Sequence, residues 1–224
     1  LAKMVSEQIG CLHFVMNVVH LMGKSECGVS SQVDEELLRL MIPVAKLYTG
    51  KRCVQLLSEG VEMIGGQGYI EDTGIPALLR NGQVLPIWEG TTIVLSLDVV
   101  RVLSRNVEVI NSWKQRILDM VDAHRQDSEL YTVVEKIREA AVLISSFVSS
   151  ARDSKNEMSL QLYARELTFS IAQTYIASLL LCHAHRHVLD QFMADHDPLA
   201  PIKVALENTD NKAMVHREQF VSKL

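Results

Sequence analysis

The sequence has few residues that break helices, few aromatic residues and no regular set of cysteines. Only 5 prolines and 11 glycines occur among 224 residues, and 5% of the residues are aromatic. This composition disfavours a turn-rich β protein. The 4 cysteines form no CxxC pair and no regular framework, so disulfides are not indicated. We expect reduced thiols, as in a cytosolic type of compartment, and not a secreted protein.

Long apolar runs and a strong charge of one sign are also missing. The longest apolar runs, such as 176–182, are far shorter than the roughly 20 residues that cross a bilayer. The net charge of −5 excludes nucleic-acid binding by charge alone. At the same time, 48% hydrophobic residues are too many for a disordered chain. We therefore expect a folded protein without a membrane segment.

The sequence does have a strong helical periodicity. Apolar residues recur at spacings of three and four, as on one face of a helix. Ser31 or Asp34 can cap one helix and Pro43 is expected to kink it, while glycines at 65–69 and PIWEG at 86–90 interrupt the pattern. The predicted fold class is all-α. Helices are predicted at 1–22, 33–64, 75–85, 91–103, 107–123, 130–150 and 160–190, with a short last helix at 211–220.

The pattern divides the chain near Arg105. Residues 1–105 carry 9 basic and 11 acidic residues, giving −2, so residues 106–224 carry the remaining 13 basic and 16 acidic residues, giving −3. Neither part is a polyanion binder by composition. Because the chain starts with Leu1 inside a helical pattern rather than with methionine, we expect a fragment of a longer protein.

Three short motifs are the most informative part of the sequence: GGQGY at 65–69, LLR at 78–80 and IWEGTT at 87–92. The amides of a glycine loop can approach a phosphate closely. Glu89 stands between a tryptophan and a glycine, and burial beside the aromatic ring would suit it to act as a general base. Each motif also has a plain structural interpretation, as a helix stop or as a first-turn charge that favours the helix dipole. Their order and spacing together are more specific.

Together the motifs resemble the C-terminal helical domain of the acyl-CoA dehydrogenases, in which GGxG(Y/F), LxR and (Y/W)EG(T/S) follow one another. The resemblance covers residues 1 to about 103. Trp88, the preceding Pro-Ile and LDVVR at 97–101 are most similar to the subgroup of bacterial alkylation-response flavoproteins and their animal relatives. Because that subgroup carries an extra helical tail, the resemblance implies a common domain at 1–105 and a tail at 106–224.

The resemblance implies a FAD-dependent enzyme that dehydrogenates fatty acyl-CoA in β-oxidation. Glu89 takes the place of the catalytic base, which removes the α-proton while the β-hydrogen leaves as hydride to N5 of FAD. Trp88 and Gly90 would line both flavin and substrate, and Arg80 would orient loops. Arg101 would be structural or lie near the cofactor. The implied cofactor contacts are Gly65, Gly66, Trp88, Gly90, Thr91 and Thr92, the two glycines toward the FAD of a neighbouring subunit.

Two residues depart from the family pattern. Glu62 stands where ordinary members have a FAD-contacting glutamine, although the alkylation-response subgroup shares the glutamate. Ile93 stands where many members have a polar residue, and its side chain has no hydrogen-bonding group, which would reduce cofactor affinity. The N-terminal helical domain and the middle β-domain of the family have no counterpart here. The chain alone is therefore not expected to be an active dehydrogenase.

The implied partners are those of the family: fatty acyl-CoA, further copies in a homodimer or homotetramer, and electron-transfer flavoprotein or oxygen as the electron acceptor. Ser222-Lys223-Leu224 is a peroxisomal address when it is the free carboxyl terminus. We therefore expect a peroxisomal protein, with the mitochondrion as the alternative.

The histidine-rich segment at 182–187 is the remaining candidate for chemistry. His183 and His187 would lie one helical turn apart, a spacing that can bind a metal. No carboxylate pair completes the set, so a histidine-rich helix end is the preferred interpretation and no metal site is predicted.

Two other functions stay open from the sequence. The chain could belong to a non-catalytic relative that holds acyl-CoA or nucleic acid through its tail, although the charge of −3 on 106–224 argues against nucleic acid. It could also be a helical interaction module from a truncated transcript, in which Glu89 and the glycine loop are unused.

Overall fold

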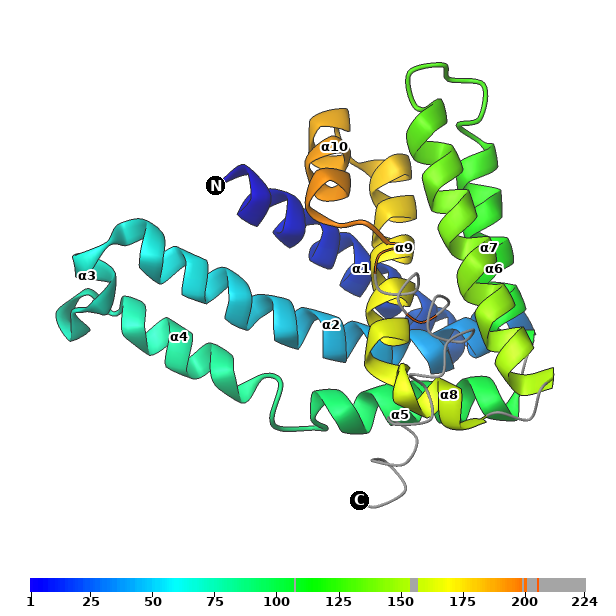
Figure 1. The fold of residues 1–224 in the computed structure, drawn as a ribbon, viewed down its shortest axis with the longest axis horizontal. Helices are drawn as coiled ribbons and strands as arrows, with labels where there is room; N and C mark the ends of the chain where they lie inside the picture. The colour runs from blue at the N-terminus through cyan, green and yellow to red at the C-terminus, as the bar shows by residue number, and fades with distance from the viewer. Residues whose placement is uncertain (107, 154–156, 199, 201–204, 206–224) are drawn as a thin grey trace.

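A computed structural model describes residues 1–106, 108–153, 157–198, 200 and 205. All regular elements in these ranges are helices, which confirms the predicted all-α class. The helix predicted at 211–220 lies outside the described residues. The first region contains α1 (Ala2–Glu26), α2 (Gln32–Ile64), α3 (Gly66–Tyr69), the 3-10 helix η1 (Glu71–Thr73), α4 (Ile75–Val84) and α5 (Thr92–Arg105). The second contains α6 (Glu108–Asp122), α7 (Tyr131–Asp153), α8 (Glu157–Leu162), α9 (Ala164–His183) and α10 (Arg186–Asp195) (Figure 1).

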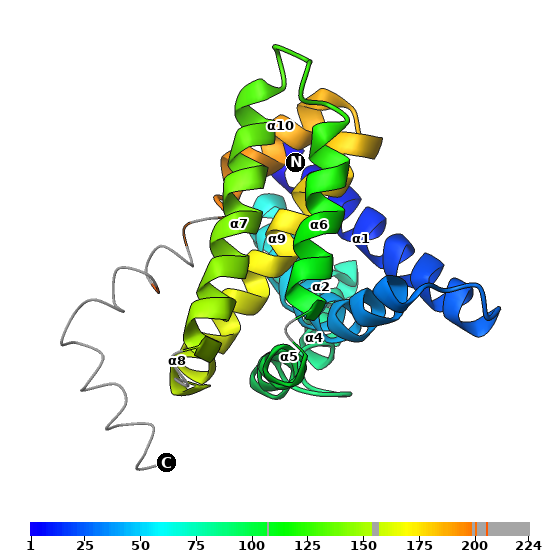
Figure 2. The same ribbon diagram turned by 90° about the vertical axis from the view of Figure 1, so that its right-hand side faces the viewer.

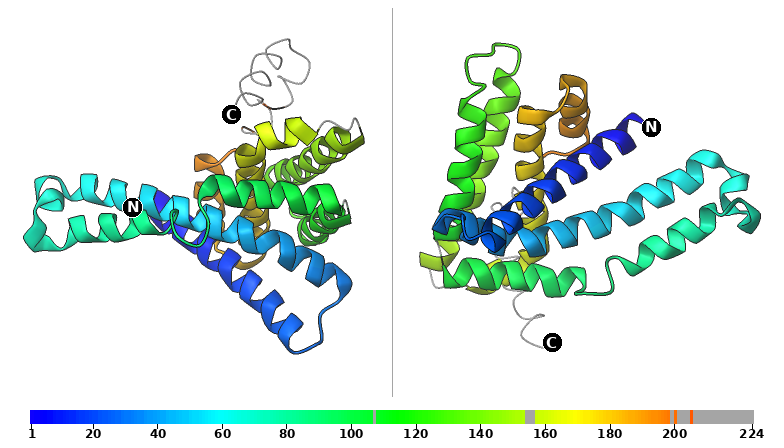
Figure 3. Two further views of the ribbon diagram at one scale, coloured as in Figure 1. Left: turned by 90° about the horizontal axis from the view of Figure 1, so that it is seen from below. Right: turned by 180° about the vertical axis from the view of Figure 1, so that it is seen from behind.

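Helix α2 begins at the predicted cap and is the longest element. The Ser31 Oγ accepts from the Asp34 amide at 3.2 Å, and the Asp34 carboxylate accepts from the Ser31 amide at 3.0 Å, which forms a capping box. The helix is 33 residues long and continues through Pro43. Its outer half leaves the body of the molecule and α4 runs back beside it, so the two helices form a projecting hairpin (Figure 3).

The turn at the tip of this hairpin differs from the predicted loop at 65–69, because it contains the one-turn helix α3. Gly65 has φ 70°, which ends α2, and the Gly68 amide then donates to the Gly65 carbonyl at 2.8 Å. A Cβ at Gly68 would lie 2.2 Å from the carbonyl oxygen of Val61. Only glycine therefore allows α3 to fold back on the end of α2.

The single helix predicted at 160–190 is wrong, because the structure divides this segment into α8, α9 and α10. The backbone is extended at Ala184 and His185, where ψ is 160° and 142°. This bend folds α10 back against α1 and buries Leu189 and Phe192. The bend contains neither proline nor glycine. It forms because α10 thereby buries its apolar face, and the apolar periodicity of the sequence did not reveal it.

Helix α9 is the centre of the molecule. All residues from 170 to 181 are buried, and α9 packs against α1, α2, α5, α6, α7 and α10 (Figures 1 and 2). One hydrophobic cluster includes residues of both regions, for example Phe14 and Tyr48 with Tyr175 and Ile176. In the described part of the chain, no helix combines the length and the apolar character needed to span a bilayer.

Candidate active site

The loop between α4 and α5 presents Glu89 in a strained backbone conformation. Glu89 has φ 57° and is the one non-glycine residue of the described chain with positive φ, and Gly90 follows with φ 107°. Such a conformation costs a non-glycine residue about 1 to 3 kcal/mol and is found most often at functional sites. The loop turns outward, since Glu89 is exposed and Trp88 keeps 57% of its surface exposed.

The expected burial of Glu89 beside Trp88 is therefore not present in the described structure. Both side chains face solvent, so this chain alone leaves the carboxylate in water. A general base works best where water is excluded. The described residues do not provide such surroundings for Glu89.

Lys46 of α2 holds this loop from the inner side. Its Nζ donates to the carbonyl oxygen of Trp88 at 2.6 Å and also to the carbonyl oxygen of Gly90. Burial lowers the pKa of Lys46, and the negative charge of Glu89 opposes that shift. Sequence reasoning missed Lys46. A signal was present, because Lys46 interrupts the otherwise apolar sequence Val44-Ala45 and Leu47-Tyr48, which the structure buries.

Helix α5 begins shortly after Glu89 in the sequence, at Thr92. Thr91 is the N-cap residue, with extended φ −71° and ψ 165°, and its side chain makes no capping hydrogen bond. The first backbone bond of the helix runs from the Leu95 amide to the Thr91 carbonyl at 3.0 Å. The amides before Leu95 are thus available to a polar or anionic group. Thr92 is buried and Ile93 is 57% exposed.

Gly65 and Gly66 form an exposed backbone surface at the other end of α4. A Cβ at either residue would meet no heavy atom within 4 Å, so a ligand or a neighbouring chain can approach closely. Helix α4 separates this turn from the loop that joins α4 to α5 (Figure 1), and its 10 residues correspond to about 15 Å. Within one chain, the structure does not bring the two sets of expected cofactor contacts together.

The two arginines singled out in the sequence make surface ion pairs. Arg80 binds Glu71 through two parallel hydrogen bonds of 2.7 and 2.9 Å, which ties α4 to η1 and agrees with the expected loop-orienting role. Arg101 binds Asp98 at 2.9 Å, and Asp98 also binds Arg39 of α2. The Arg101 pair therefore lies within α5, and Asp98 connects α5 to α2 through Arg39.

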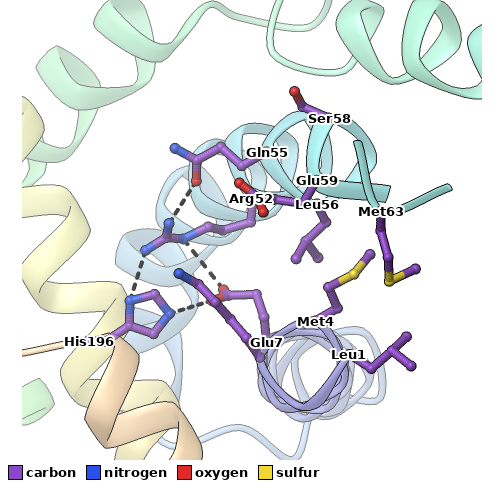
Figure 4. Close-up of a pocket in the computed structure, with 11 residues that line it drawn as sticks. Leu1, Met4, Glu7, Arg52, Gln55, Leu56, Ser58, Glu59, Met63 and His196 are labelled. Carbon is purple, nitrogen blue, oxygen red and sulfur yellow. Dashed lines mark hydrogen bonds and ion pairs between the residues drawn. The ribbon is translucent and has the colours of Figure 1, made fainter. Parts of the chain in front are cut away.

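A second cluster of charged side chains lies in a pocket of about 530 Å³ between α1 and α2 (Figure 4). His196 follows α10, and its Nε2 contacts the Glu7 carboxylate. The Arg52 Nη2 donates to the His196 Nδ1 at 3.0 Å, and the Arg52 Nε lies 3.5 Å from Glu7. Because arginine has only donors, Nδ1 must be the acceptor and Nε2 carries the proton toward Glu7. No sequence pattern indicated this cluster, because Glu7 and His196 are 189 residues apart.

The histidines do not form a metal site in the described part of the chain. No group of three or more metal-ligating side chains occurs there. His183 ends α9 and His187 lies in α10, so the expected single-helix spacing does not exist. The ring of His183 stacks on that of His13 with centroids 5.8 Å apart. His183 therefore packs α9 against α1.

Comparisons of sequence identify two matching families. The model described as "Acyl-CoA dehydrogenase, C-terminal domain" matches residues 4–104. The model described as "Acyl-CoA dehydrogenase 11 C-terminal domain-like" matches residues 108–200. Acyl-CoA dehydrogenase family member 11 of Caenorhabditis elegans is 42% identical over 187 residues, which are 82% of this chain and 30% of that protein. AidB of Escherichia coli (strain K12) is 32% identical over 104 residues, which are 46% of this chain and 19% of that protein.

Comparison with solved structures gives the same relationship. The crystal structure of C. elegans ACDH-11 in complex with C11-CoA has a TM-score of 0.82 and 36% identity, and the match covers 88% of this chain and 35% of that chain. This chain thus spans 19 to 35% of the lengths of these relatives. The two matching models, the shared helical fold and the order of the glycine, LxR and Trp-Glu-Gly motifs show that the chain belongs to the acyl-CoA dehydrogenase family, as part of its C-terminal helical region.

Proposed function

We propose that this chain provides the catalytic base, Glu89, and part of the flavin-binding surface of a FAD-dependent acyl-CoA dehydrogenase that acts on fatty acyl-CoA. The observation that carries the proposal is the presentation of Glu89 on a strained, outward-facing turn between Trp88 and Gly90. The family supports the reaction class. The relative ACDH-11 was solved with C11-CoA, which supports a fatty acyl-CoA as substrate.

The chemistry of the loop suits a flavin. FAD, when bound, would accept the β-hydrogen of the substrate as hydride. Trp88 offers an exposed aromatic face on which a planar ring can stack. The free first-turn amides behind Thr91 offer hydrogen-bond donors to a polar group. Glu89 would take the α-proton of the thioester, because it is the acidic side chain that the turn projects beside these groups.

Gly65 and Gly66 then face a cofactor bound mainly by another subunit. They lie at the opposite end of α4 from Glu89, and their open backbone surface favours close approach by a second molecule. This supports assembly as a homodimer or homotetramer. The assembly is tested by analytical sedimentation of the natural full-length product that contains this chain. A monomer would contradict the proposal.

Substitution of Glu89 by glutamine in that product is the decisive experiment. Glu89→Gln keeps the shape of the side chain but removes the base, so flavin should remain bound while its reduction by acyl-CoA falls by about 10²-fold or more. The measurement is anaerobic bleaching of the flavin absorbance in a stopped-flow instrument. Glu139→Gln, an exposed glutamate on α7, is the matched control and should reduce at the normal rate.

Normal bleaching in the Glu89→Gln protein would remove Glu89 from the catalytic role. A product that binds acyl-CoA but holds no flavin would instead indicate the non-catalytic relative. Duplex binding with a steep dependence on salt would indicate the nucleic-acid-binding relative.

We extend the proposal to compartment and electron acceptor. Ser222-Lys223-Leu224 lies outside the described residues and would direct the protein to peroxisomes if Leu224 is the free terminus, with oxygen as the acceptor. Mitochondria with electron-transfer flavoprotein are the alternative. Imaging of a fusion with a fluorescent protein at the N-terminal side, with and without Leu224, decides between the two compartments.

A further inference from the structure

The carbonyl groups of the residues before and after Glu89 both accept a hydrogen bond from the ammonium group of Lys46. The Nζ of Lys46 donates to the carbonyl oxygen of Trp88 at 2.6 Å and to that of Gly90. The hydrogen bonds of Nζ therefore go to the backbone that carries Glu89 and not to its carboxylate. Lys46 is distant in sequence, 42 residues before Trp88, and acts from a different helix.

We propose that Lys46 is a positioning residue that fixes the direction of the Glu89 side chain toward the reacting carbon by clamping the carbonyl groups of the residues before and after it, Trp88 and Gly90. The proposal rests on the proposed role of Glu89 as the base. A base must be held in near-attack geometry, and a displacement of about 1 Å can lower a rate about 10²-fold.

The turn needs such a clamp because its backbone conformation is unfavourable by itself. Glu89 has φ 57° and Gly90 has φ 107°. A non-glycine residue with positive φ persists only where its surroundings determine it. The two charge-assisted hydrogen bonds from Lys46 to the carbonyl groups of Trp88 and Gly90 hold this conformation, since such bonds are stronger than neutral ones.

Helix α2 is a rigid base for the clamp. The residues on both sides of Lys46, Ala45 and Leu47, are 7% and 2% exposed, so the Cα of Lys46 is fixed by the core. One turn further along, a Cβ on Gly50 would lie 3.4 Å from the backbone carbonyl of Leu85. The start of the loop thus rests on α2 at Gly50 while its end is held at Lys46.

The first test measures the loop and not the reaction. In the natural full-length product, Lys46→Met removes all three donors but keeps the aliphatic part of the chain. Hydrogen exchange in the peptide that covers 86–95 should rise at least about tenfold, by local opening, whereas a peptide from the capped start of α2, 31–42, should be unchanged. Lys51→Met, on the same helix, is the matched control and should leave both peptides unchanged. Unchanged exchange at 86–95 in Lys46→Met would overturn the proposal.

The second test measures the consequence for catalysis. Lys46→Met should retain bound flavin and show an unchanged acyl-CoA dissociation constant, but its rate constant of flavin reduction should fall about 10- to 100-fold. Lys46→Arg, which keeps a charged donor, should recover part of the rate. A change in affinity alone, or an Arg variant as slow as the Met variant, would contradict a positioning role.

The two proposals fail separately. If Glu89→Gln reduces its flavin normally, the role of Glu89 fails, whatever Lys46 does. If Glu89→Gln is inactive and Lys46→Met is normal in both exchange and rate, only the positioning role fails. If Lys46→Met does not fold, Lys46→Gln, whose amide keeps two donors, takes its place and must show faster exchange and a slower rate than the wild type for the proposal to stand.

Discussion

At the scale of single residues, the described structure contains two polar arrangements with opposite surroundings. Glu89 is exposed on a strained turn with positive φ. Glu7 is buried, with its side chain 4% exposed, and contacts His196 and Arg52. The Glu89 carboxylate is accessible to solvent, whereas burial and ion pairing make Glu7 a structural group.

The Glu7 pair predicts a defined dependence of stability on pH. Burial raises the pKa of Glu7, but the hydrogen bond from His196 and the charge of Arg52 outweigh it, so the pKa lies below its ordinary value of 4.5. A depressed carboxyl pKa stabilises the fold above the unfolded-state value, and this contribution is lost as pH falls through the folded-state value. Glu7→Gln should therefore lower the free energy of unfolding by about 1.5 to 3 kcal/mol at pH 7.

The measurement is the free energy of urea unfolding of both proteins between pH 3 and pH 7. A shift of one pKa unit changes this free energy by about 1.4 kcal/mol. The difference between wild type and Glu7→Gln should be constant above about pH 5 and shrink below pH 4.5. Glu26→Gln, an exposed glutamate on the same helix, should show almost no difference at any pH. A difference that grows as pH falls would refute the assignment of sign.

At the scale of elements, close packing of α1 on α9 joins the two matched regions. A Cβ at Gly10 would lie 2.7 Å from the Cγ2 of Ile176, a distance that real side chains do not reach. Ile176 is β-branched and fully buried, so it cannot turn aside easily. Gly10 therefore sets how closely α1 approaches the central helix.

This contact predicts opposite effects for two glycine substitutions in one helix. Gly10→Ala should destabilise the protein by about 1 to 3 kcal/mol through overpacking. The higher helix propensity of alanine offsets up to about 1 kcal/mol of this loss. Gly23→Ala meets nothing within 4 Å and should stabilise by up to about 1 kcal/mol. Thermal unfolding followed by circular dichroism gives both values. Equal shifts in the two variants would show that α1 does not press on α9 as described.

At the scale of the whole molecule, the second region completes the core of the first. Helix α9 packs against α1, α2 and α5 of the first region and against α6 and α7 of the second. The outward face of α1 stays apolar, with Leu12 and Met16 58% and 56% exposed. Exposed apolar faces of this kind are typical of surfaces that meet other chains or domains.

Removal of the second region is expected to unfold the first. A protein that ends at residue 105 would expose the faces of α1, α2 and α5 that pack on α9, and it should lack a cooperative thermal transition and bind ANS. Residues 1–224 should unfold in one transition, because one core serves both regions. Calorimetry of both proteins is the measurement, and a cooperative transition in residues 1–105 would contradict a shared core.

Local sequence features determined the parts of the structure that depend on neighbours along the chain. The Ser31 capping box, the end of α2 at Gly65 and the start of α4 after Gly74 follow from side chains and glycines within a few residues. The order of motifs around Glu89 likewise identified the family and the candidate base, because those motifs lie close together in the sequence.

Only the tertiary structure decided the rest. The bend before α10 has no proline or glycine and exists because α10 gains burial against α1. The clamp of Lys46 and the contact of Glu7 with His196 join residues 42 and 189 positions apart, and periodicity carries no information over such distances. The exposure of Glu89 was also beyond the sequence. Whether a carboxylate is buried depends on which other elements pack over it, and in the described part of the chain Glu89 faces solvent.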